Sequence, residues 1–101
     1  MFKFGYLYAM PGFISTEISE SRTDVACFYT ASVDIMNKET AVDVARHLVK
    51  EYNVSMIELC GGLANATLVS AVKDAVGPNV AVGQVMYGPE YRRTLVDLLN
   101  L

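Results

Sequence analysis

The residues best suited to chemistry stand in one short segment, Ile57-Glu58-Leu59-Cys60-Gly61-Gly62-Leu63. Glu58 lies in an apolar run that we expect to be buried, and a buried carboxylate needs a partner or stays protonated. The candidate partners are Arg22, Arg92 and Arg93. Glu58 is therefore either a ligand-binding or general-base group, or a structural carboxylate that holds a neighbouring loop through backbone N–H groups.

Cys60 and the pair Gly61-Gly62 follow at the point where a strand should turn into a helix. A thiol at such a position can be activated as a nucleophile, although a small buried cysteine is the commoner outcome. The glycines would let the backbone approach a ligand, and a helix start offers free N–H groups to an anion. The same pair can simply make a tight turn, so both interpretations stay open.

Other reactive arrangements are disfavoured by the sequence. His47 is the single histidine, and it falls away from the apolar stripe of its predicted helix, so a Cys–His nucleophilic pair is not expected. With one histidine and two cysteines the chain offers no zinc pattern. It also has no G-x-G-x-x-G or P-loop sequence for a nucleotide. We therefore expect neither a metal nor a cofactor.

Strands and helices that alternate along the chain must position these residues. Apolar and β-favouring runs predict strands at residues 2–9, 23–31, 54–60 and 80–85. Helical periodicity predicts three helices, after the caps Asn37 and Asn65 and from Pro89 onward. The polar stretch 13–22 is expected to be a loop with at most a short helix.

Strands separated by helices imply right-handed crossovers and a mainly parallel sheet. We predict a single α/β domain over residues 1–101, with a four-stranded, mainly parallel sheet and about three helices. Strands 2–9, 54–60 and 80–85 should be neighbours in its centre. The continuous apolar character of the latter two indicates burial on both faces of the sheet. We reject a ferredoxin-like fold, because that fold needs a hairpin between its second and third strands and the sequence predicts a long helix there.

The carboxyl ends of parallel strands share one edge, where α/β proteins bind ligands. We expect the candidate residues to gather at this edge of the sheet. The catalytic candidates are Glu58, Cys60 and Tyr87. The ligand-binding candidates are Gly61, Gly62, Asp34, Arg92 and Arg93.

Three classes of function remain open. The favoured class is a binding protein for a small anionic or carboxylate metabolite, held by the Gly61 and Gly62 N–H groups with Arg92 or Arg93. The second is a small enzyme of the isomerase or lyase type, in which Glu58 is the general base. The third is a structural or partner-binding protein without a ligand.

Composition limits the partners and the compartment. The net charge of −3, with scattered Lys and Arg, argues against nucleic acid. A hydrophobic share of 52% with 19% charged residues predicts a homo-oligomer, through the Leu-rich residues 94–101 or the aromatic strands. No membrane span or signal peptide is expected, and two cysteines are too few for a disulfide scaffold, so we expect a cytoplasmic protein.

Three segments and the start of the chain carry a resemblance. Residues 40–48, Ile57–Leu63 and Val80–Val85, together with Tyr8-Ala9-Met10-Pro11-Gly12, resemble a family of uncharacterised bacterial proteins of about this length. That resemblance covers most of the chain and implies no activity. About 30 residues from Ile57 also resemble one unit of the copper-homeostasis barrel proteins, which is an analogy of fold alone.

Overall fold

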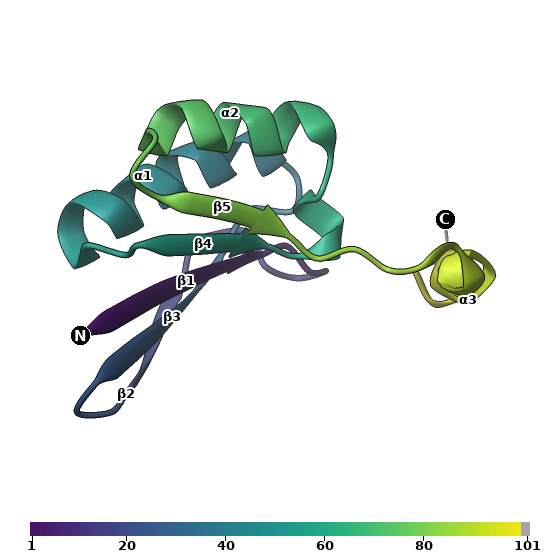
Figure 1. Cartoon of the computed structure of the whole chain (residues 1–101). Helices are drawn as coiled ribbons and strands as arrows, with labels where there is room; N and C mark the ends of the chain where they lie inside the picture. The colour runs from purple at the N-terminus through teal and green to yellow at the C-terminus, as the bar shows by residue number, and fades with distance from the viewer. Residues whose placement is uncertain (100–101) are drawn as a thin grey trace.

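A mixed five-stranded sheet with two helices packed on one side forms the body of the protein (Figure 1). The computed structural model describes residues 1–99. The strands are β1 (Phe2–Tyr8), β2 (Ile18–Arg22), β3 (Ala26–Ser32), β4 (Met56–Leu59) and β5 (Ala81–Gln84). The helices are α1 (Ala41–Tyr52), α2 (Ala66–Val76) and α3 (Arg92–Leu99), with the short 3-10 turns η1 (Lys38–Thr40), η2 (Gly61–Leu63) and η3 (Pro89–Tyr91).

The strand order is β2-β3-β1-β4-β5, and only β2 runs antiparallel to its neighbour. The predicted α/β class and the mainly parallel sheet are confirmed, and β1, β4 and β5 are neighbours as expected. The number of strands was wrong, because the sheet has five. The central placement of all three strands was also wrong, since β5 forms an edge.

The missed strand, β2, lies in the polar stretch that we expected to be a loop. It forms a hairpin with β3, in register from Ile18 opposite Ala31 to Arg22 opposite Cys27. The Thr23 hydroxyl accepts the N–H groups of Val25 and Ala26 and so shapes the turn. An edge strand with one solvent-facing side needs no apolar run, which is why β2 gave no hydrophobic signal.

Two helices cover the same face of the sheet because their crossovers run in the same direction. From β3 the chain passes over β1 to β4 through α1, and from β4 it continues to β5 through α2. Right-handed crossovers in one direction place their helices on one side of a sheet. The connection that runs the other way, from β1 to β3, contains an antiparallel strand instead of a helix, so it adds nothing to the second face.

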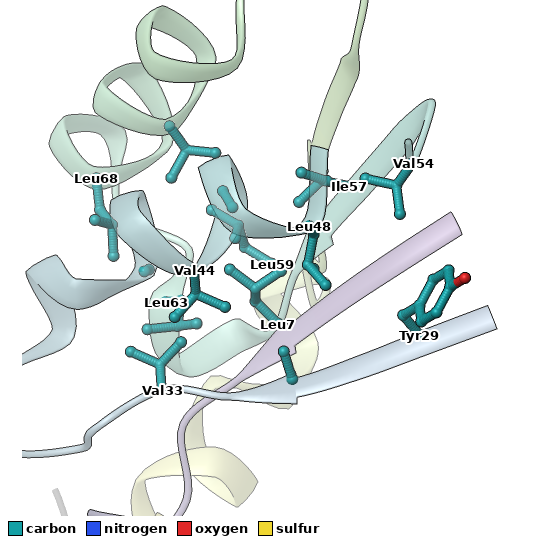
Figure 2. Packing of buried hydrophobic residues seen from close by; sticks show 14 of the residues in the cluster. Leu7, Tyr29, Val33, Val44, Leu48, Val54, Ile57, Leu59, Leu63 and Leu68 are labelled. Atoms are coloured by element: carbon teal, nitrogen blue, oxygen red, sulfur yellow. The ribbon is translucent and has the colours of Figure 1, made fainter. Parts of the chain in front are cut away.

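The hydrophobic core fills the space between the sheet and these two helices (Figure 2). Alternate residues of the central strands point into it, and all of the following are buried: Leu7, Cys27, Tyr29, Ala31, Ile57 and Leu59. The helices contribute Ala41, Val44, Ala45, Leu48, Leu68 and Val72. Asn65 caps α2 as predicted, with its side chain accepting the Leu68 N–H at 2.8 Å, whereas Asn37 makes no side-chain cap bond.

The opposite side of the sheet carries no helix of this body. Its side chains are those of the alternate strand positions, and we call them the bare face: Phe2, Phe4, Tyr6, Tyr8, Phe28, Met56, Glu58, Ala81 and Gly83. Phe2 is 51% and Phe28 38% exposed. The expectation that strands 54–60 and 80–85 are buried on both faces is therefore wrong for the single chain, because every crossover helix lies on one side.

The last helix, α3, stands apart from this body (Figure 1). An extended stretch, residues 85–88, leads from β5 past the edge of the sheet to η3 and α3. Within the chain, α3 packs chiefly against η3. It begins at Arg92, three residues after the Pro89 start that we predicted, and the predicted tail residues 100–101 lie outside the described part. No helix described over residues 1–99 is long and apolar enough to cross a bilayer.

Candidate functional site

The chain changes direction between β1 and β4, and the candidate residues lie around that point. The connection after β1 leaves towards β2, and the connection after β4 leaves towards β5. Ligands of α/β proteins bind where neighbouring connections part in this way. Here Ala9 N–H donates to the Cys60 Sγ at 3.4 Å, and a Cβ on Gly62 would lie 3.5 Å from the Ala9 carbonyl oxygen.

Glu58, Cys60 and Tyr87, the three catalytic candidates, lie near one another on this side of the sheet. Glu58 and Cys60 share the bare side of their strand, two residues apart. The Tyr87 ring, on the stretch that leaves β5, lies over Gly61, with its Cε2 atom 3.4 Å from where a Cβ would stand. The structure thus brings these groups together at the carboxyl edge.

A fourth member of this group, Tyr6, was missed by the sequence analysis. Tyr6 stands opposite Glu58 in the register between β1 and β4. Partial burial raises the pKa of Tyr6, with smaller contributions from the neighbouring charges of Cys60, Tyr87 and Glu58 in that order. The alternation of β1 put Tyr6 on the same side as Phe4, but only the strand order could show that β4 is its neighbour.

Glu58 has no ion-pair or side-chain hydrogen-bond partner among residues 1–99. Arg22, one proposed partner, pairs with Glu20 at 3.2 Å on the distant β2 strand. The alternative in which backbone N–H groups enclose Glu58 is likewise not seen in this part of the chain. No buried polar side-chain atom of the described residues lacks a partner, so the half-buried Glu58 carboxylate keeps contact with solvent.

The helix that we expected to start directly after Gly61 and Gly62 begins further along the chain, and the anion site at these glycines stays a prediction. These glycines form the turn η2, and α2 begins only at Ala66. The Asn65 side chain caps that helix start, so the glycine N–H groups do not stand at the end of the α2 dipole. The Gly61-Gly62 pair makes the tight turn of the alternative interpretation.

The other candidates are placed apart from the group of Tyr6, Glu58, Cys60 and Tyr87. Asp34 follows β3, and its carboxylate accepts the Met36 N–H at 2.8 Å, which shapes the local loop. Arg92 and Arg93 lie on α3, both exposed. His47 is exposed on α1, with its ring 5.7 Å from that of Tyr52.

The hollows of the molecule do not coincide with this group. One of about 550 Å³ lies along α3 itself, between Pro89 and Asp97. Another of about 340 Å³ lies at the amino end of the bare face, lined by Phe2, Phe4 and Phe28 among others. Neither hollow is lined by Tyr6, Glu58, Cys60 or Tyr87. No group of three or more His, Cys, Asp or Glu residues suited to a metal occurs in the described part.

The structure defines a two-layer α/β domain with one bare sheet face and a helical arm. A family model described as a family of unknown function (DUF6506) matches residues 2–100, and the chain belongs to that family. The resemblance to an uncharacterised family is thereby confirmed, while its bacterial origin remains an expectation. Neither the curated proteins nor the solved structures include a significant match.

Proposed function

We propose that the protein binds a small carboxylic acid bearing a hydroxyl or amino group, at the carboxyl edge of its bare face. The observation that carries this proposal is the half-buried Glu58 carboxylate, which has no partner among residues 1–99, beside Tyr6, Cys60 and Tyr87. This carboxylate keeps contact with solvent and lies beside aromatic side chains, so it can accept a hydrogen bond from a ligand that donates one.

The negative charge of Glu58 restricts which end of the ligand can lie against it. The Glu58 carboxylate repels an anionic group, so the hydroxyl or amine of the ligand should face Glu58. The anionic end of the ligand then needs a cation, and Arg92 and Arg93 are the candidates that the sequence offers. Both cysteines are free, which is compatible with the cytoplasm that we propose as the compartment.

A panel of small hydroxy and amino acids tests the proposal by thermal shift and saturation-transfer NMR. We expect at least one compound to bind the natural protein and to lose binding in Glu58→Gln, whose unfolding midpoint without ligand stays close to normal. Glu51→Gln, at an exposed position on α1, is the control and should bind normally. Binding that survives in Glu58→Gln, or a full panel without binders, would contradict the proposal. Lost stability without any binder would support the structural role of Glu58.

A second candidate function is acid–base catalysis, favoured by the pairing of Tyr6 and Glu58 across β1 and β4. The raised pKa of Tyr6 keeps its phenol protonated, so that it can donate a hydrogen bond to a carbonyl oxygen. Glu58 would then take a proton from the carbon next to that carbonyl. A bound compound kept in D₂O should exchange this hydrogen for deuterium, detectable by NMR, and Glu58→Gln should stop the exchange. Exchange that continues in Glu58→Gln would exclude this role.

A further inference from the structure

Two surfaces are largely without a packing partner within residues 1–99: the bare face, apart from Tyr8, whose ring meets that of Phe13 at 5.3 Å, and the apolar side of α3. Parallel sheets are almost always covered on both faces, so the exposed aromatic side chains of β1 and β3 are unusual. An isolated helix of eight residues is unstable in water, because the free-energy cost of forming its first turn exceeds the stabilisation from its few hydrogen bonds. Both surfaces therefore require a cover, and each is suited to cover the other.

The charges on these two surfaces are complementary. On α3, the spacing i, i+3, i+4 puts Arg92 between Leu95 and Val96, in the middle of the apolar side, whereas Arg93 neighbours Val96 and Asp97 at the edge of that side. An arginine on the apolar side of a helix requires an anion when that side is buried. On the bare face, Glu58 is the carboxylate that has no partner among the described residues.

The areas also favour reciprocal contact between two copies. Five strands about 4.8 Å apart, with four to seven residues each, give the bare face roughly 400–500 Å². Each partner of a stable interface contributes about 800 Å². The arm, residues 85–99, adds roughly 300 Å² when one side of a helix of this length is buried. If each copy both gives an arm and receives one, each buries roughly 300 Å² of its arm and a similar area of its bare face, and the total of about 1,200 Å² is at the lower end of the range of standard interfaces.

The path of the arm points away from its own sheet. Val85 N–H still donates to the Leu59 carbonyl at 2.9 Å, and Tyr87 lies on Gly61, so the arm leaves β5 in a fixed direction. Beyond this root, Figure 1 shows α3 clear of the sheet, past its carboxyl edge. A helix held in this position is available to a second copy of the chain.

We propose that two copies exchange their arms, so that α3 of each copy lies on the bare face of the other and places Arg92 beside the partner's Glu58. The partner's arm then covers the surface around Tyr6, Glu58 and Tyr87, forms a pocket there and supplies its cation. This last step rests on the proposed function. The exchange itself is independent of any ligand.

Mixing two charge-reversed chains tests the exchange. Glu58→Arg alone and Arg92→Glu alone each place like charges together, and we expect each to weaken the homodimer at least about tenfold in Kd. In a mixture of the two variants, both contacts of the mixed dimer pair opposite charges, so heterodimers should form with nearly the natural Kd. Sedimentation and native mass spectrometry measure both effects. Arg93→Glu, at the edge of the apolar side of α3 and beside Asp97, is the control and should weaken the dimer less than Arg92→Glu does.

Three results would overturn the exchange. They are a monomeric natural protein at 100 μM, a dimer that Arg92→Glu leaves unchanged, and single variants that mixing does not rescue, as expected if α3 folds onto its own sheet. Leu95→Glu provides a second variant whose own fold should be unaffected, and it should be monomeric with a normal circular-dichroism spectrum. A rescued dimer in which no compound of the panel binds would refute the proposed function and leave the exchange intact.

Discussion

The two faces of the sheet use the same strands in opposite ways. On the covered face, Leu7, Ile57 and Leu59 are fully buried under α1 and α2. On the bare face, the alternate positions carry large aromatic side chains that remain partly exposed, and a carboxylate that has no partner in the part of the chain that the structure describes. Stability of the single chain therefore comes mainly from one face, while the other leaves apolar area and a charge partly exposed.

This difference originates in the connections rather than in the strands. A strand has the same alternation whichever side a helix covers, and the direction of the crossovers decides which side that is. Substitutions of similar chemistry on the two faces should therefore have unequal consequences for folding.

The largest effect is expected from truncation on the covered face. Leu7→Ala removes a fully buried side chain beneath α1, and the cavity should lower the free energy of unfolding by about 2–5 kcal/mol. Urea denaturation followed by circular dichroism measures this loss. A loss below about 1 kcal/mol would show that this face is not the packed core.

A smaller effect is expected where β1 meets α1 most closely. A Cβ on Gly5 would lie 3.0 Å from the Leu48 Cδ1, and Leu48 is itself fully buried. Gly5→Ala should therefore destabilise the fold by about 1–2 kcal/mol through overpacking, despite the lower chain entropy of alanine. Equilibrium unfolding tests this, and Gly5→Ala combined with Leu48→Ala should recover part of the Gly5→Ala cost. Independent, additive losses would contradict the close approach.

On the bare face, the loss of an aromatic ring should affect folding less. The rings of Phe28 and Phe4 meet edge to face at 5.1 Å, and such a pair contributes about 0.5–1.5 kcal/mol. Phe28→Ser should lower the unfolding free energy of the dilute protein by about 1 kcal/mol, and it should reduce the binding of an apolar dye. A loss equal to that of Leu7→Ala would mean that both faces contribute alike to the stability of the single chain.

The smallest effect is expected from the ionisation of a tyrosine at the covered face. A hydrogen-bonding interaction with Cys27, followed by burial, raises the pKa of Tyr29 at the covered face to about 12. Its folded pKa exceeds the unfolded value near 10, so its contribution to stability is present below about pH 10 and is lost as the pH rises through 12. Absorbance at 295 nm follows the ionisation of the tyrosines. The Tyr29→Phe variant should lack the titration step at the highest pH. An unchanged step at the highest pH in Tyr29→Phe would refute this assignment.

The sequence by itself determined the elements whose hydrophobic pattern is strong. The twelve residues of α1 carry an apolar stripe at helical spacing, and β1 and β4 are apolar runs bounded by turn residues, so local pattern sufficed for each. The α/β class followed from their alternation, and the grouping of Glu58, Cys60 and Tyr87 followed from strand direction. Each of these depends on neighbours in sequence or on a general rule of handedness.

Only the tertiary structure decided which groups stand side by side and which face is covered. The polar strand β2 is stabilised by its pairing with β3, a contact that no local pattern encodes. Tyr6 joins Glu58 because β4 lies next to β1, and Gly61-Gly62 is separated from the α2 start by the cap of Asn65. The bare face exists because both crossovers run in the same direction, and crossover direction is a property of strand order that hydrophobic periodicity does not record.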